Sequence, residues 1–161
     1  DAGVGTYTRQ TFSSERYSIW TMQSNYHNLP MVNGVPQQFG SEFRATDVHF
    51  DSRRMYFSAN IATAYPAEAF SLDKADKPNQ VNFLTWGEVD VSVPGVVTVE
   101  VNGEKVRMTY NKSAFTPTVE TIRLDDPRLS NVWGEQVCRI SLNANKQPLS
   151  GSYTYTITTI K

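Results

Sequence analysis

The sequence predicts an all-β domain, a two-sheet antiparallel β-sandwich or jelly roll with little helix, spanning residues 1–161 as a single domain. Short stretches in which apolar and polar residues alternate recur along the chain, with Gly, Pro, Asn and Asp between them. The chain is rich in Thr, Ser, Asn, Val and Tyr and poor in long helix formers. Asn102-Gly103 stands between two alternating runs, which is the strongest short-range signal for a β-hairpin.

The first half of the chain is expected to hold several strands and one long loop. The expected strands are residues 5–12, 17–22, 43–50, 55–63 and 81–86. Alternation places Val48, Phe50 and Phe57 on inward faces of their strands. Residues 66–76 are expected to hold one or two helical turns. The long loop, residues 23–40, carries Tyr26 and His27, and long loops on a rigid β scaffold are where binding residues usually lie.

The second half is expected to hold further strands and one helical turn. The expected strands are residues 88–93, the hairpin 96–110, and residues 117–124, 137–142 and 152–160. One helical turn is expected within residues 125–131. Together with the following residues it forms another long connection, 125–136, which carries Asn131 and Trp133. In the last strand, alternation places Tyr153 and Tyr155 in the core.

The hairpin at 96–110 is specified down to its register. A two-residue type I′ turn at Asn102-Gly103 pairs Val101 with Glu104 and therefore Val99 with Val106. One face of the hairpin then becomes wholly apolar, and the other face is polar and charged. The apolar face consists of Val97, Val99, Val101, Val106, Met108 and Tyr110.

The single cysteine, Cys138, limits the covalent and metal chemistry of the chain. One cysteine excludes an internal disulfide and a thiolate cluster that could hold zinc. Cys138 shares a strand face with Ile140 and Leu142, so its thiol is expected to be buried and inert.

Residues 46–51, TDVHFD, place two carboxylates around an imidazole. On an extended strand Asp47, His49 and Asp51 point the same way, as a metal site or an acid–base pair would require. Because Val48 and Phe50 take the inward face, the favoured interpretation is a polar strand face, with Asp51 opening the turn that follows. No metal site and no cofactor are predicted.

Two stretches resemble segments of known families. Residues 86–93, WGEVDVSV, resemble the active-site strand of laminarinase-type β-glucanases, which implies a nucleophile at Glu88 and a middle carboxylate at Asp90. Val93 stands where those enzymes carry the acid/base, and a retaining glycosidase needs both carboxyl groups. Residues 148–160, PLSGSYTYTITTI, resemble the final strand of secreted bacterial β-sandwich subunits, fimbrial ones among them, and of some viral spike heads.

Charge and hydropathy exclude two classes of partner. The net charge is −1, with no clustered Lys or Arg, so no nucleic-acid partner is expected. No apolar run is long enough to span a membrane. The Thr-, Ser- and Asn-rich texture is typical of a secreted or surface-exposed domain, and we expect an extracellular or virion location.

No complete catalytic set is visible, so a non-enzymatic function is predicted. The leading hypothesis is a recognition domain that binds a glycan or a protein receptor through its loops, with Tyr26, His27, Asn131 and Trp133 as candidate ligand-binding residues. One alternative is a structural or accessory domain that associates with copies of itself or with the rest of a longer chain, as in a capsid, spike, pilus or secreted enzyme. The other is a small carbohydrate-active hydrolase or lyase that uses Asp47, His49, Glu88 and Asp90.

Overall fold

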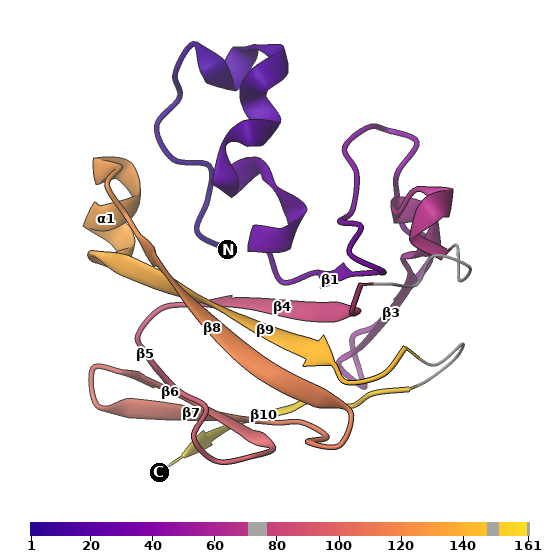
Figure 1. Ribbon diagram of the computed structural model, residues 1–161, viewed down its shortest axis with the longest axis vertical. Coiled ribbons are helices and arrows are strands. Elements are labelled where there is room, and N and C mark those ends of the chain that lie inside the picture. Colours follow the sequence, from indigo (N-terminus) through magenta and orange to yellow (C-terminus); the bar gives the residue numbers. More distant parts are fainter. Residues whose placement is uncertain (71–76, 148–151, 161) are drawn as a thin grey trace.

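The computed structural model, which describes residues 1–70, 77–147 and 152–160, confirms the all-β sandwich (Figure 1). Two four-stranded sheets carry the fold, and every strand pair is antiparallel. Sheet I has the order β1 (Pro30–Met31), β4 (Gln80–Thr85), β9 (Gln136–Ala144) and β8 (Phe115–Arg123). Sheet II has the order β10 (Thr156–Ile160), β7 (Glu104–Thr109), β6 (Val96–Val101) and β5 (Glu88–Asp90).

The main core lies between the two sheets. Leu142 of sheet I and Val97 of sheet II are both fully buried, at 0% exposure. The rest of this cluster comes from β7, β8 and β9 and from the residue that follows β7, and its members Ile140 and Leu142 stand at alternate positions of β9, as period-two patterning requires. The buried members are Val97, Met108, Tyr110, Phe115, Ile140 and Leu142. Cys138 of β9 is also buried, and its thiol contacts the Gly87 carbonyl oxygen at 3.8 Å.

The predicted hairpin is confirmed residue by residue. Val97 pairs with Met108 and Val99 with Val106, and Val101 pairs with Glu104 beside the turn. Asn102 and Gly103 have φ of 51° and 83°, the two positive values that a type I′ turn requires. The apolar face is covered where it meets the core but opens toward the turn, so Val106 is 36% exposed.

The N-terminal segment, residues 5–29, does not form the two strands that its pattern predicted. Residues 10–12, 17–18 and 20–22 instead belong to a series of short 3₁₀ helices, and residues 5–9 form neither strand nor helix. These are η1 (Gln10–Phe12), η2 (Ser14–Ser18), η3 (Trp20–Met22) and η4 (Ser24–Tyr26). Ser13 begins η2 as an N-cap, because its hydroxyl accepts a hydrogen bond from the Glu15 amide at 3.1 Å. The alternation in this segment was therefore a misleading signal.

The N-terminal segment covers the face of sheet I that points away from sheet II (Figure 1). Hydrogen bonds join it to the sheet. The Asn82 amide N–H donates to the Leu29 carbonyl oxygen at 3.2 Å, and the Leu84 N–H donates to Asn28 Oδ1 at 2.7 Å. Asn82 is itself buried and accepts a hydrogen bond from Ser141 Oγ at 2.8 Å. Asn82 and Ser141, which pair across β4 and β9, form a buried polar stripe on this face of sheet I, and their side chains are hydrogen-bonded to each other.

A separate hairpin of β2 (Thr46–Asp51) and β3 (Tyr56–Asn60) corrects a second prediction. Val48, Phe50 and Phe57 are not inward; they are 61%, 61% and 64% exposed. The hairpin forms its own two-stranded sheet, and none of the buried clusters among the described residues includes its side chains. Alternation identifies residues that share a face, but it does not show whether anything covers that face. Tyr153, also predicted as core, is partly exposed although its ring meets Phe115 edge-on.

Little helix is present, as predicted: the described part of the chain holds a single α-helix, α1 (Pro127–Trp133), which overlaps the helical turn expected within residues 125–131. Asp126 caps α1 by accepting a hydrogen bond from the Arg128 N–H at 2.9 Å, and Pro127 occupies the first turn. Hydrogen bonds from Thr6 and Arg128 hold the pKa of Asp126 below its usual value. Asp126 therefore also joins the N-terminal segment to α1.

The remaining helical turns are η5 (Ala62–Ala64) and η6 (Ala67–Phe70). One or two helical turns were predicted within residues 66–76, and η6 lies in that stretch. Residues 71–76 of the stretch lie outside the described residues. Among the described residues, no helix has the length and apolar character needed to cross a bilayer.

Candidate functional site

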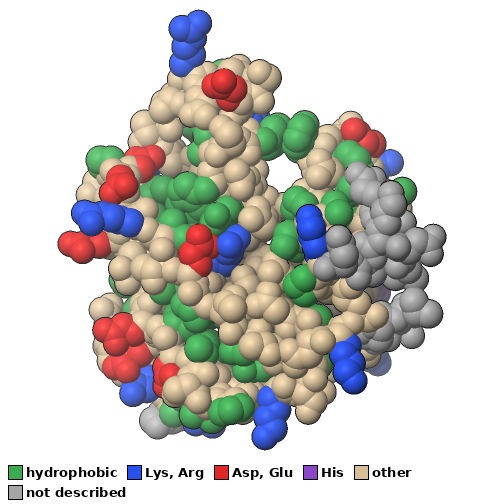
Figure 2. All heavy atoms as spheres, in the orientation of Figure 1, with side chains coloured by type: hydrophobic (Ala, Val, Ile, Leu, Met, Phe, Trp, Pro, Cys, Tyr) green, Lys and Arg blue, Asp and Glu red, His purple; other side chains and the backbone are tan. Residues whose placement is uncertain are grey.

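A cavity of about 460 Å³ lies between the N-terminal segment and the loop that follows β1. Figure 2 shows the surface hollowed between these two parts of the chain. The volume falls within the range of about 300–1,000 Å³ that is typical of small-molecule sites. The lining residues are Tyr17, Met22, Gln23, Ser24, Asn25, His27, Leu29, Pro36, Gln37, Gln38 and Phe39. Most of them belong to the long loop in which binding residues were expected.

A tight turn at Asn33-Gly34 builds one wall of the cavity. Both residues have positive φ, 51° and 72°, and the flanking Val32 and Val35 exchange backbone hydrogen bonds of 3.1 and 2.8 Å. Val32 and Val35 pack against a small buried cluster that includes Tyr65. The turn reverses the chain, so residues 36–39 run back toward the N-terminal segment.

Hydrogen bonds join the two walls. Ser24 Oγ donates to the Gln37 carbonyl oxygen at 2.9 Å, and this bond connects η4 to residues 36–39 of the loop that follows β1. Within the N-terminal segment, Gln23 Nε2 donates to the Tyr17 carbonyl oxygen at 3.1 Å. The walls are therefore held together independently of any ligand.

An aromatic pair stands at the cavity. The rings of Tyr17 and Phe39 are stacked, with centroids 3.7 Å apart and planes inclined by 9°. The Arg16 guanidinium lies over the same Tyr17 ring, 5.7 Å from its centroid. Phe39 is more than half exposed, so this pair offers an aromatic surface to the solvent side of the cavity.

Side-chain amides supply most of the polar groups. Within the described residues, no hydrogen bond joins the side-chain amides of Asn25, Gln37 or Gln38 to another protein group. Each amide offers an N–H₂ donor and a carbonyl acceptor. No Asp, Glu, Lys or Arg is among the lining residues. The cavity lining thus combines an apolar, partly aromatic surface with side-chain amides, and His27 is its one lining residue in an ion pair among the described residues.

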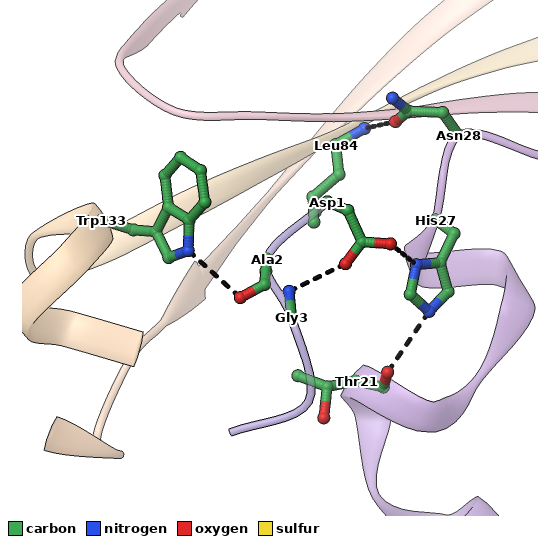
Figure 3. Close-up of polar contacts among 8 residues, drawn as sticks. All are labelled: Asp1, Ala2, Gly3, Thr21, His27, Asn28, Leu84 and Trp133. Atoms are coloured by element: carbon green, nitrogen blue, oxygen red, sulfur yellow. Dashed lines mark hydrogen bonds and ion pairs between the residues drawn. The ribbon is translucent and has the colours of Figure 1, made fainter. Parts of the chain in front are cut away.

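His27 and Tyr26, two of the candidate ligand-binding residues, lie at this end of the molecule. His27 lines the cavity, and its ring nitrogens meet Asp1 Oδ2 at 2.7 Å and the Thr21 carbonyl oxygen at 3.3 Å (Figure 3). The Tyr26 ring faces sheet I, where the Arg139 guanidinium lies 4.3 Å from its centroid. Tyr26 also meets Trp20 edge-on, at 5.4 Å between centroids. The structure thus gives Tyr26 an anchoring role beneath the cavity.

Asn131 and Trp133, the other two candidates, lie on α1, away from the cavity lining. The Trp133 indole N–H donates to the Ala2 carbonyl oxygen at 3.1 Å (Figure 3). The ring packs beside a buried cluster of Leu124, Leu129 and Val137. It borders a small cavity of about 40 Å³, which is room for about one water molecule. Asn131 is exposed.

The residues of the proposed hydrolase are divided between two sheets. Asp47 and His49 belong to β2, whereas Glu88 and Asp90 belong to β5, and β3 and β5 lie on opposite sides of Figure 1. Asp51 accepts hydrogen bonds from the N–H groups of residues 53 and 54, as expected of a residue that opens a turn. Among the described residues, no group of three or more His, Cys, Asp and Glu is placed to hold a metal ion.

Glu88 lies opposite Glu100 in the ladder between β5 and β6. The Glu100 carboxylate is paired with Lys105 Nζ at 3.0 Å, which offsets the repulsion between the two acids. Hydrogen bonds from Ser92 hold the pKa of Asp90 below its usual value. The contacts of Glu88 and Asp90 are therefore those of residues in a short strand and in the turn that follows it.

No protein-family model matches this sequence, and no curated protein matches it.

Several lining residues were missed by sequence reasoning. Tyr17 was assigned to a strand, and Gln37 and Gln38 were passed over as loop residues. One signal pointed to them: VNGV at 32–35 is an Asn-Gly pair between two valines, like the pair at 102–103. Recognising that turn would have brought residues 36–39 back against residues 17–29.

Proposed function

We propose that this chain is a non-enzymatic recognition domain of an extracellular or virion-surface protein, and that it binds its ligand through the cavity at residues 17–39. The observation that carries the proposal is the lining, in which stacked aromatic rings stand together with the side-chain amides of Asn25, Gln37 and Gln38, which have no hydrogen-bond partner among the described residues. Ligand sites typically combine an apolar or aromatic surface with a few polar groups that fix orientation. The ligand is a glycan or a protein receptor.

The sandwich supports this proposal by supplying a rigid base. Sheet I lies beneath the N-terminal segment, and the Arg139 guanidinium joins the two by donating to the Asn25 carbonyl oxygen at 3.3 Å. Arg139 is also paired with Glu120 Oε2 of the neighbouring strand at 2.7 Å. A loop site on such a base keeps its shape before binding, which lowers the entropic cost of association.

The test is a binding screen on a printed surface that carries both glycans and ectodomains of cell-surface proteins. We expect the wild-type domain to bind at least one printed ligand and the double variant Gln37→Ala/Gln38→Ala to bind it about tenfold or more weakly, because each hydrogen bond contributes about 0.5–1.5 kcal/mol. Gln136→Ala is the matched control, since Gln136 is an exposed glutamine on β9 outside the cavity. No binding to any printed ligand, or equal binding by the double variant, would contradict the proposal.

A second candidate function, assembly with further copies or with the rest of a longer chain, is favoured by the β2–β3 hairpin. Phe50 and Phe57 are directly paired across its strands, and both rings are exposed. Exposed apolar patches of this kind often mark interaction sites. Sedimentation velocity separates the two functions: an assembly role predicts a mass that rises with concentration and returns to that of the monomer in Phe50→Ser. A constant monomer mass would count against assembly.

A further inference from the structure

We propose that the cavity at residues 17–39 takes an uncharged sugar residue, with one face of the sugar ring lying on Phe39. This inference rests on the proposed recognition function and adds to it the chemical class of the ligand. Three properties of the lining carry it: the stacked aromatic pair, the side-chain amides of Asn25, Gln37 and Gln38, which have no hydrogen-bond partner among the described residues, and a lining without Asp, Glu, Lys or Arg.

The first property is a rigid aromatic platform. Phe39 is held parallel to Tyr17 at 3.7 Å, and Arg16 lies over the Tyr17 ring. One face of Phe39 is therefore occupied by Tyr17, and the residue as a whole remains more than half exposed. A pyranose presents a face of C–H groups, which packs on an aromatic ring and removes apolar surface from water. Because the stack already exists, little side-chain entropy is lost when the sugar arrives.

The second property is the kind of hydrogen bond on offer. Asn25, Gln37 and Gln38 each present a donor and an acceptor from one side chain. A sugar hydroxyl is also both donor and acceptor, so one amide can satisfy one or two hydroxyl groups. Amides left unpaired in a filled cavity would each cost free energy, so a ligand without hydroxyl or amide groups is disfavoured.

The main chain of this wall is poorly suited to an extended peptide. A peptide that adds a strand needs a row of free N–H and C=O groups. Pro36 has no N–H, and the Gln37 carbonyl oxygen already accepts from Ser24 Oγ. Recognition here falls to side chains, which favours a sugar over a peptide strand.

The third property is neutrality. The lining holds no carboxylate, ammonium or guanidinium group, and His27 is engaged with Asp1. A charged ligand group that entered the cavity would lose hydration without gaining a close partner of opposite charge. Arg16 lies beside the lining residues Met22 and Tyr17 but is not itself a lining residue, so an acidic sugar could reach its guanidinium only from outside the cavity.

The test is a titration followed by nuclear magnetic resonance, with methyl glycosides of galactose, mannose and N-acetylglucosamine as neutral probes and sialyllactose and a sulfated galactose as acidic probes. We expect at least one neutral probe to bind more tightly than either acidic probe. Phe39→Leu should weaken that binding about tenfold, and Phe39→Tyr should restore it, because tyrosine keeps the ring. Phe12→Leu is the matched control, because Phe12 is an exposed phenylalanine of the N-terminal segment that lies outside the cavity lining.

The outcomes separate this inference from the proposed function. Binding of acidic probes alone, or unchanged binding in Phe39→Leu, would overturn the inference. Binding in the earlier screen to protein ectodomains alone, still lost in the Gln37→Ala/Gln38→Ala variant, would also overturn it while leaving the recognition function in place. Unchanged melting temperatures of the variants establish that a loss of binding is not a loss of folding.

Discussion

Replacing Leu142 with alanine is expected to lower the free energy of unfolding by about 2–5 kcal/mol, the range for large-to-small changes in a core. Leu142 has no exposed surface and lies on β9, which is the strand between β4 and β8. Its side chain belongs to the cluster that joins the two sheets, so its removal leaves a cavity that rigid strands on both sides cannot close. For a chain of this length the melting temperature should fall by about 10 °C.

Phe50→Ala is the control for that measurement. It removes a larger apolar side chain, but one that is 61% exposed on the β2–β3 hairpin. We therefore expect the free energy of unfolding to change by much less than in Leu142→Ala, because less apolar surface returns to water on unfolding. Thermal and denaturant unfolding of both variants provides the comparison. Equal losses would mean that the hairpin is packed onto the body of the domain.

The substitution Gly87→Ala is expected to cost about 2–4 kcal/mol, from backbone strain and overpacking together. Gly87 has φ of 101° at the point where the chain passes from β4 of sheet I to β5 of sheet II. A Cβ atom there would overlap the Glu100 carbonyl oxygen and lie 2.5 Å from Cγ2 of Val101. The chain must therefore either shift β6 or abandon this crossing.

Gly103→Ala separates the two costs. Gly103 also has positive φ, 83°, but a Cβ there meets nothing within 4 Å. Only backbone strain remains, and we expect a loss of about 1 kcal/mol. Denaturant unfolding of the two variants side by side measures the difference. If Gly103→Ala proves as damaging as Gly87→Ala, steric overlap is not the cause of the larger effect.

The parts of the fold that the sequence predicts correctly depend on local chemistry. The hairpin at 96–109 has a turn that only positive φ satisfies, and a one-residue slip would expose Val97 and Met108. The start of α1 is also determined locally, because Asp126 is its N-cap and Pro127 occupies the first helical position. Such signals need no knowledge of the rest of the molecule.

The N-terminal segment could not be predicted by the same means. Its position depends on a polar stripe of sheet I that reads in the sequence as a solvent face. Asn82 and Ser141 are buried there because the segment and the sheet satisfy each other's hydrogen bonds. Hydrophobic periodicity identifies apolar faces and does not identify a buried polar interface. Residues 17–22 were therefore assigned to a strand from their own weak alternation.

The candidate site was predicted in part. The loop 23–40 was expected to carry binding residues, and the cavity with His27 lies there. The contribution of Tyr17 could not be seen, because it depends on a stacking contact with Phe39, twenty-two positions further along the chain. Trp133 attracted attention as a loop tryptophan, but its place beneath the Ala2 carbonyl is a tertiary contact that no motif encodes.

The series of 3₁₀ helices that carries one wall of the cavity has a consequence for its dynamics. Their backbone hydrogen bonds join residues three apart, such as Met22 N–H to the Ile19 carbonyl and Gln23 N–H to the Trp20 carbonyl. A segment with such local bonds can open without breaking either four-stranded ladder, so its opening free energy lies below that of global unfolding. Molecules in which this wall has opened do not bind, so the apparent affinity is the intrinsic affinity multiplied by the fraction of molecules in which the wall is closed. Substitutions that stabilise η3 and η4 would therefore tighten binding without touching the ligand.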